Sequence, residues 1–411
     1  GAGRYPYQST FASGTGYAFG YSQSTIPGFY ESMAGNANNK WEISDMLNIG
    51  LDWDFWNKKL YGSLDIFKEW RSNILVERST IPNTLGVAVA KDSYGKAETK
   101  GLEVTIGHRN HVGKFNYYVE GMLTYNTNKI TEMDETEPNV EWQRKTGKRI
   151  YDYTSVAGLY ESSFNGGVGG WNIYKFEQWA TDPNLIATSQ QDAIDHPEKY
   201  PYNSASPKTG QQLGTAVFKD LNGDRQIDSN DMTPDTYTII PELIPTITLG
   251  FEYKGLDAHA TLTAYLNRDV FLSPAIGWSG WGNQGTHEVV NCWGYYTDDP
   301  LDPRNINAKY PRPTYGGYNP IDSERSTGTY QNDIWIQNGN YLSLRNIEVG
   351  YSLPKQLIAK AGMTKCRFYF TGYNLFNWSG LPDGCDPEKP MGYVWWYPKT
   401  HSFTFGVNIG F

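Results

Sequence analysis

The sequence predicts an all-β protein, an antiparallel β-barrel that spans a membrane. Three observations predict it: apolar and polar residues alternate repeatedly, short and long connections alternate, and the carboxyl-terminal strand is aromatic. Aromatic residues make up 15% of the 411 residues, which include 43 Gly, a mixture that suits strands and turns better than helices. No apolar run approaches the length of about 18 residues that a transmembrane helix needs.

The terminal strand shows the alternation most clearly. Between Ser402 and Phe411, every second residue is apolar, and the residues between are small or polar. Side chains of a strand point alternately to opposite faces, so this strand has one apolar and one polar face. A tilted strand of about 9–11 residues with one apolar face is long enough to cross a bilayer. The last strand of a soluble sandwich would show the same pattern, so the rest of the chain decides between the two.

The same alternation recurs and predicts about eleven strands. It is regular over 47–55, 115–126 and 247–253, whereas 367–376 is ambiguous because both of its faces carry aromatic residues. The predicted strands are 41–56, 59–77, 95–109, 114–133, 150–160, 171–178, 243–253, 256–272, 339–353, 364–377 and 401–411.

Short and long connections alternate between these strands. Tight turns are predicted at Asn57–Lys58, Asn110–Gly113 and Lys254–Gly255, and the connection 354–362 is longer but compact. In a membrane barrel this alternation puts every long connection on the extracellular side and every short turn on the periplasmic side. The long connections are 78–94, 134–149, 179–242, 273–338 and 378–400.

The strand number indicates that the barrel is larger than this sequence. A single-chain antiparallel barrel needs an even number of strands, and eleven is odd. The chain is therefore predicted to be the carboxy-terminal half of a larger barrel over its whole length, 1–411.

The acidic residues of the strands share the face opposite the apolar residues. This arrangement suits the wet lumen of a barrel and the solvent face of a sandwich equally. They are Asp52, Asp54, Glu103, Glu120, Glu252 and Asp257.

Charge and cysteine content exclude some other classes. The net charge of −9 argues against a nucleic-acid partner. The three Cys form no CxxC motif, so the sequence indicates neither a zinc site nor a redox pair. Cys292 and Cys385 both fall in predicted loops, where they could pair in an oxidising compartment or remain thiols.

The segment Asp220–Asp231 predicts a calcium site in the loop 178–242. Oxygen-bearing side chains stand at five positions of a calcium-loop spacing, and a sixth position would bind through its backbone carbonyl. Arg225 replaces the usual Gly, and the last ligand is Asp instead of Glu; the alternative is an acidic turn without an ion. The predicted role of calcium is structural, stiffening the loop. The predicted ligands are Asp220, Asn222, Asp224, Gln226, Asp228 and Asp231.

Aromatic residues crowd two of the long connections, the loop 273–338 and the loop 378–400. Flat rings beside Asn, Asp and Gln suit stacking on sugars or gripping an extended peptide. Packing between loops, or an interface with a partner, would use the same residues. The candidate contact residues are Trp278, Trp281, Trp293, Tyr295, Tyr296, Trp395 and Trp396.

Several segments together resemble the SusC/RagA family of TonB-dependent outer-membrane transporters. The resemblance runs over nearly the whole chain, in the order of that family's carboxy-terminal half. The segments are PGFYESMAGNANNKWEISDMLNIGLDWDFW, GTAVFKDLNGDRQIDSNDM, NGNYLSLRNIEVGYSLP, FYFTGYNLFNWSG and the terminal aromatic strand.

The resemblance implies an outer-membrane barrel of about 22 strands, closed by an amino-terminal plug. It also implies uptake of oligosaccharides or peptides, powered by TonB, with a SusD-like lipoprotein on the extracellular loops. The plug and the TonB box are not in this sequence. Phe411 looks like the terminal aromatic residue that the outer-membrane assembly machinery reads.

Two other hypotheses remain open at this point. The first is a secreted, calcium-stabilised protein of the adhesin type that binds glycans or proteins. The second is a carbohydrate-active enzyme, although the sequence has no GxSxG motif, no HExxH motif and no phosphate loop, so no enzyme is expected. Fractionation with detergent separates a barrel from a secreted protein, and glycan turnover would reveal an enzyme.

Overall fold

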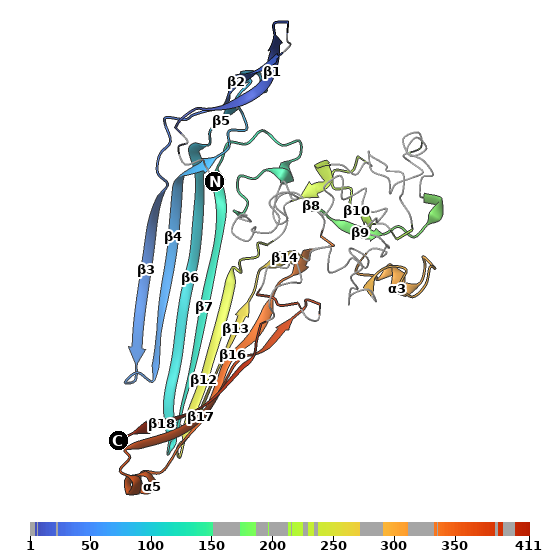
Figure 1. Cartoon of the computed structure of the whole chain (residues 1–411). Helices are drawn as coiled ribbons and strands as arrows, with labels where there is room; N and C mark the ends of the chain where they lie inside the picture. The colour runs from blue at the N-terminus through green and yellow to red at the C-terminus, as the bar shows by residue number, and fades with distance from the viewer. Residues whose placement is uncertain are drawn as a thin grey trace. The chain divides into compact units, whose positions relative to one another are not determined.

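Nine long strands form one sheet, and each strand lies beside the next one along the chain (Figure 1). The computed structural model describes residues 5, 7–21, 24–150, 173–185, 196, 213–214, 216–224, 229–233, 237–271, 291–310, 333–334, 336–382, 385–388 and 399–411. The strands of the sheet, from edge to edge, are β3 (Ile43–Phe55), β4 (Leu60–Val76), β6 (Asp92–Val112), β7 (Phe115–Glu132), β12 (Leu243–Tyr253), β13 (Leu256–Tyr265), β16 (Tyr341–Ser352), β17 (Lys365–Ser379) and β18 (Ser402–Gly410).

These nine strands confirm nine of the predicted strands and the all-β antiparallel class. Of the remaining two, 150–160 lies outside the described residues from 151 onward. The prediction of a barrel strand at 171–178 is wrong. That segment forms two short strands, which pair in two small sheets with strands of the same long connection. These short strands are β8 (Ile173–Tyr174), β9 (Phe176–Trp179), β10 (Ala216–Phe218) and β11 (Met232–Thr233).

Other short elements also lie outside the main sheet. The hairpin of β1 (Thr10–Phe19) and β2 (Ser24–Ala34) was not predicted, because its Gly, Ser and Thr residues give no regular apolar alternation. Strand β5 (Ala88–Val89) pairs with β2. The predicted strand 256–272 ends early: Asn267 has a positive φ of 58°, and β14 (Asp269–Phe271) then pairs with β15 (Ile336–Asn338).

The cross-strand register gives the sheet one apolar face and one polar face. Directly paired residues of neighbouring strands lie on the same face of a sheet, so rows of pairs trace each face. One row across six strands is apolar: Val119, Leu249, Ala260, Ile347, Gly372 and Phe403. The next row is polar or aromatic: Glu120, Thr248, Thr261, Asn346, Tyr373 and Ser402.

The apolar face is exposed instead of buried. Large side chains such as Leu249, Val349, Phe370 and Phe405 are among the exposed residues, although they share a single face. A soluble protein rarely exposes a continuous apolar surface of this extent. This face therefore needs a covering other than water.

Backbone angles confirm the predicted tight turns at 57–58 and 254–255, whereas the turn predicted at 110–113 lies later, because β6 continues to Val112 and the turn begins at Gly113. Lys254 and Gly255 have φ of 50° and 89°, and Asn57 and Lys58 have φ of 55° and 66°. The two consecutive positive φ values at Lys254 and Gly255 are typical of the two-residue turns that match the twist of a hairpin, whereas the turn before β4 is longer and already has a positive φ of 51° at Trp56. The compact connection after β16 contains α5 (Lys355–Ile358) and η8 (Ala359–Ala361) and ends at Gly362, whose φ is also positive.

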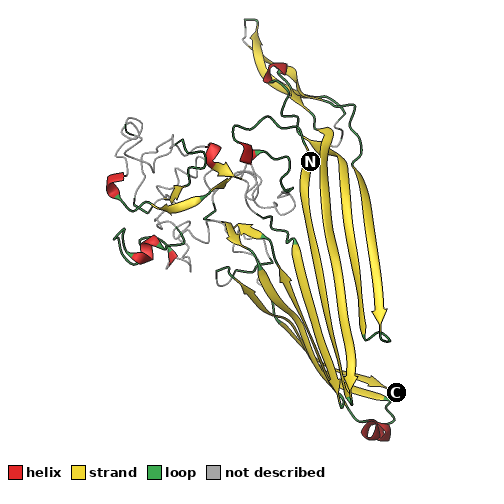
Figure 2. Cartoon of the chain, turned by 180° about the vertical axis from the view of Figure 1, so that it is seen from behind, coloured by secondary structure: helices red, strands yellow, loops and turns green. Residues whose placement is uncertain are grey.

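Helices are few and short in the described part of the chain (Figure 2). None of them has the length and apolar character needed to cross a membrane. The chain divides into two units, and the division crosses β3, β4, β6 and β7. One unit contains 1–50, 65–102 and 126–150, and the other contains 51–64, 103–125 and 151–411.

Candidate functional site

The polar face of the sheet carries a charged cluster around Arg367. Its Nε donates to Oδ1 of Asp257 at 3.0 Å, and its Nη2 donates to Oε1 of Glu348 at 2.7 Å. The Thr371 hydroxyl donates to the second oxygen of Glu348 at 2.8 Å. One planar guanidinium therefore joins carboxylates from two other strands, a geometry that suits Arg and not Lys.

Other polar contacts continue along this face. The Tyr61 hydroxyl donates to Oε2 of Glu120 at 2.8 Å, and the hydroxyls of Thr248 and Thr261 lie 3.2 Å apart. The acidic residues Glu120 and Asp257, which the sequence places opposite the apolar residues, are thus both hydrogen-bonded on the polar face. A face of this kind suits the wet interior of a barrel.

Glycines on the polar face provide space for rings of the neighbouring strand. A Cβ on Gly250 would lie 2.3 Å from the ring of Tyr118, and a Cβ on Gly406 would lie 2.3 Å from the ring of Tyr369. Both rings lie directly over backbone, so any larger residue would displace them. These glycines are therefore required by close approach and not by a special backbone angle.

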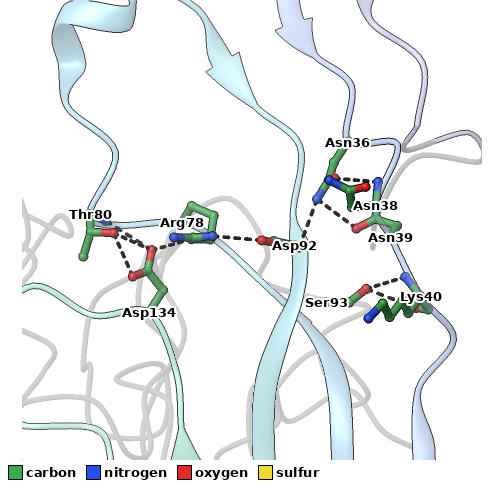
Figure 3. A network of polar contacts seen from close by, with 9 residues as sticks. All are labelled: Asn36, Asn38, Asn39, Lys40, Arg78, Thr80, Asp92, Ser93 and Asp134. Atoms are coloured by element: carbon green, nitrogen blue, oxygen red, sulfur yellow. Dashed lines mark hydrogen bonds and ion pairs between the residues drawn. The ribbon is translucent and has the colours of Figure 1, made fainter.

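A second polar network lies where β4, β6 and β7 meet the chain before β3 (Figure 3). The Arg78 guanidinium donates to Asp134 from Nε at 2.9 Å and to Asp92 from Nη1 at 2.8 Å. Thr80 donates to Asp134 from its amide at 3.2 Å and from its hydroxyl at 2.8 Å, and the Asn36 amide group donates to Asp92 at 3.0 Å.

This network keeps Asp134 ionised. Burial alone would raise the pKa of the Asp134 carboxyl, but the hydrogen bonds from Arg78 and Thr80 outweigh it and hold the pKa below its usual value. The same contacts tie together the connection 78–94 and the start of the connection 134–149. The network therefore fixes the strand ends from which two long connections begin.

Arg268 forms hydrogen bonds to three further segments of the connections. It is 5% exposed, and its guanidinium donates to the backbone carbonyls of Ile239 at 2.9 Å, Pro387 at 2.6 Å and Gly339 at 3.3 Å. These carbonyls belong to the chain after the calcium motif, the last long connection and the chain before β16. A single buried cation therefore fixes three loop segments at the end of the sheet.

A group of charged and aromatic residues surrounds Glu388. Arg345 and Lys399 reach the same carboxylate oxygen at 2.5 Å and 2.9 Å. Burial alone would raise the pKa of Glu388, but these two cations hold it below its usual value. The rings of Tyr265 and Tyr341 stack beside them with centroids 4.7 Å apart.

Trp293 belongs to a hydrophobic core within the long connections. Its side chain is 0% exposed, so the ring packs the loops on one another and presents no surface to a ligand. For this residue the packing alternative holds, and the proposed ligand contact is corrected. The core consists of Trp179, Ala216, Phe218, Cys292, Trp293, Tyr310 and Ile334.

Tyr295 and Tyr296 follow Trp293 after one glycine but point outward. Both are about half exposed, at 46% and 55%, and their rings meet edge to face with centroids 4.8 Å apart. The Arg304 guanidinium lies 5.2 Å from the Tyr296 ring centroid. Arg304 also donates to Asp302, and these hydrogen bonds lower the pKa of Asp302 to about 2. The two tyrosines stay candidates for ligand or partner contact.

The other candidate aromatic residues lie outside the described residues. These are Trp278, Trp281, Trp395 and Trp396. The cysteines are placed in two different clusters: Cys292 is buried in the loop core, and Cys385 packs against Val270 and Leu381. No disulfide joins these two thiols.

The calcium motif is partly described. Oδ1 of Asp220 accepts the Gly223 amide at 2.6 Å, and Oδ1 of Asn222 accepts the Asp224 amide at 2.9 Å. Asp231 is fully buried, and its Oδ1 accepts the Leu221 amide at 2.7 Å. Gln226 and Asp228 lie outside the described residues, and the residues that are described contain no group of three or more His, Cys, Asp or Glu side chains placed for a metal.

Sequence reasoning did not find the Arg78 and Arg367 networks. Arg78 and Asp134 are 56 positions apart, so no local spacing connects them. Arg367 lies in the segment whose two faces both carry aromatic residues, which hid its position on the polar face. The one feature of the sequence that pointed to the Arg367 network was Asp257, a carboxylate on the strand face opposite the apolar residues.

Comparisons with known proteins agree with this geometry. Residues 7–195 match the family described as TonB dependent receptor-like, beta-barrel. TonB-dependent receptor P3 of Formosa agariphila is 24% identical over 401 residues, which cover 92% of this chain and 35% of that protein. TonB-dependent receptor SusC of Bacteroides thetaiotaomicron is 25% identical over 384 residues, which cover 92% of this chain and 32% of that protein.

Solved structures share the fold. The RagAB peptide importer in its open-open state superposes with a TM-score of 0.64 at 16% identity, over 100% of this chain and 38% of that chain. Another structure, of the RagAB peptide transporter, gives a TM-score of 0.63 over 39% of that chain. The chain thus spans about a third of the length of the relatives named here.

Proposed function

The chain belongs to the β-barrel family of TonB-dependent receptors, and from this membership we propose that the protein imports nutrients across the outer membrane. TonB would supply the energy, and a SusD-like surface lipoprotein would work with the barrel. The substrate would be an oligosaccharide or a peptide. The single observation that carries the proposal is the continuous, exposed apolar face of a sheet whose other face is polar and hydrogen-bonded.

The two faces support a membrane barrel over a secreted adhesin. Lipid covers an apolar outer face at no cost, whereas a secreted protein would have to expose it to water. On the other face, the Arg367 cluster and the Tyr61–Glu120 contact remain favourable only where water or polar groups are near. A substrate path along this polar wall follows from the proposal.

The long connections are proposed to lie on the extracellular side, where they would meet the lipoprotein and the substrate. The loop core around Trp293 supports this proposal, because it gives the loops 178–242 and 273–338 a fixed hydrophobic centre. Tyr295 and Tyr296 are exposed beside this core and are proposed as contact residues. The RagAB structures concern a peptide importer, but at 16% identity they support the fold and not a substrate.

The test is purification of the protein from native membranes, followed by mass spectrometry. We expect it in the outer-membrane fraction, extracted only by detergent, with a co-purifying lipoprotein and a bound oligosaccharide or peptide. A Tyr295→Ala and Tyr296→Ala variant should retain less of the ligand or lipoprotein than a Tyr5→Ala and Tyr7→Ala control. Recovery in the aqueous fraction would contradict the proposal, and absence of any lipoprotein would contradict the paired importer.

A further inference from the structure

Lysines occupy the lipid-facing side of three neighbouring strands. On β7, Phe115 through Tyr125 present an apolar residue or Gly at every second position, and Lys129 follows on the same face. On β6, Lys96 and Lys100 share the face of Ile106, which is exposed. These lysines lie near the ends of the strands from which the long connections run.

Glu98 joins this group across the sheet. Its carboxylate lies 2.9 Å from Nζ of Lys68 on β4 and 3.8 Å from Nζ of Lys129 on β7. These contacts place all three side chains on one face of neighbouring strands. We call the set the lysine band: Lys68, Lys96, Lys100 and Lys129.

The ammonium groups point outward from the band. The Glu98 side chain is 14% exposed, whereas those of Lys68, Lys96 and Lys129 are 40%, 54% and 51% exposed. Lys96 also pairs with Glu132 at 2.5 Å, and Asp45 of β3 shares this face by alternation. Lys68, Lys100 and Lys129 stand against Glu98 and Asp45, which leaves this part of the band positive, whereas Glu132, from the opposite face of β7, neutralises Lys96.

The band lies where the apolar surface ends. The eleven-residue stretch from Phe115 to Tyr125 is about 34 Å long, and a tilt of about 40° gives it a height of about 25 Å, which is the height of the lipid-facing band of such barrels. Aromatic residues bound this stretch at both ends. Nζ of Lys68 lies 5.0 Å from the ring centroid of Trp70, which is exposed in the manner of an interfacial belt. Lys129 is the second residue on this face beyond Tyr125, after Thr127, which places it at the level of lipid headgroups.

We propose that the lysine band binds the phosphate groups of lipids in the outer leaflet of the outer membrane. The proposal rests on the proposed function, because it takes the long-loop end of the strands as the extracellular side. Lysine is a compact charge with three donors and a flexible stem, which suits a phosphate on a mobile lipid. In plain water such exposed ion pairs would contribute little, but beside a lipid surface the unpaired positive charge attracts anionic headgroups.

The test uses the whole protein in detergent and native mass spectrometry with two probes: monophosphoryl lipid A and the same lipid after enzymatic removal of its phosphate. The band variant changes Lys68, Lys96, Lys100 and Lys129 to Gln. A matched control changes Lys58, Lys59, Lys254 and Lys355 to Gln at the tight-turn end. We expect the band variant to bind the phosphorylated lipid about tenfold or more weakly, and the control to bind it within about twofold of the unchanged protein. Heat-resistant migration on gels checks that each variant is folded.

Three results would overturn the proposal. They are equal binding by the band variant, equal binding of the dephosphorylated lipid, and displacement of the lipid by inorganic phosphate at the same concentration, which would indicate a small-anion site instead. Membrane fractionation of the unchanged protein tests the proposed function separately. A protein found outside the outer membrane would contradict importer function, whereas the lipid titration would still report on the lysine band.

Discussion

Asp134 fixes a loop through a single carboxylate. It accepts hydrogen bonds from Arg78 and from both the amide and the hydroxyl of Thr80. Hydrogen bonds to a charged group are stronger than neutral ones, so this residue should dominate the local stability of the strand ends around it. The connection that starts at Arg78 would otherwise begin with unsatisfied polar groups.

Asp134→Asn should loosen this connection in a pH-dependent manner. The pKa of Asp134 in the folded protein is lowered from the ordinary 3.8, so its contribution is complete above that value and is lost as the pH falls through the folded pKa. At neutral pH we expect the Thr80 amide to exchange about tenfold faster in the variant, from a loss of ~1.4 kcal/mol. Hydrogen exchange corrected for intrinsic rates measures this difference, which should vanish at the acidic end of the titration. An equal difference at every pH would rule out the charge as the cause, and Asp182→Asn serves as a control.

Calcium binding at Asp220–Asp231 is a second proposal that depends on individual residues. In the described part of the motif, backbone amides already hold the carboxylates of Asp220 and Asp231 in one small loop. Calorimetry on the whole protein should show calcium binding that is lost in the Asp220→Ala and Asp224→Ala double variant. The Asp298→Ala and Asp299→Ala double variant should bind normally. Calcium binding that persists in the first double variant would leave the motif an ordinary acidic turn.

At the level of elements, the strands and hairpins were predictable from the sequence because each depends on local chemistry. Period-two alternation predicts β12 with the same bounds that the structure shows, Leu243–Tyr253. The turn at Lys254–Gly255 was predictable because such turns use residues that tolerate a positive φ. The partners of β8 and β9 were not predictable, since a short alternation does not say whether a strand joins the main sheet or a small one. Trp293 was misplaced because the sequence of an exposed aromatic loop and that of a loop core are alike.

The terminal strand β18 leads to a prediction about insertion of the protein into the membrane. Phe403, Phe405, Val407 and Ile409 share the apolar face, and each pairs across to a residue of β17. Phe411 follows the last strand residue and is exposed, so it contributes little packing. Deleting Phe411 should therefore reduce membrane insertion while leaving ligand binding by inserted protein unchanged. Quantifying inserted protein in outer-membrane fractions, with Phe19→Ala as a control, measures this effect; normal insertion would exclude Phe411 as an assembly signal.

At the scale of the whole molecule, the two faces of the sheet should differ in how much stability is lost when a charged residue is introduced. Leu249 lies in the apolar row and Thr248 in the polar row of the same strand, so the two positions differ only in face. A lysine facing the middle of a bilayer costs about 2–4 kcal/mol, whereas one facing a wet lumen costs little. Leu249→Lys should lower the free energy of folding into vesicles by about that amount, and Thr248→Lys by less than ~1 kcal/mol. Urea titration of the whole protein in vesicles measures both values. If the two variants lost equal stability, the apolar face would not face lipid, and the barrel interpretation of the sheet would have to be abandoned.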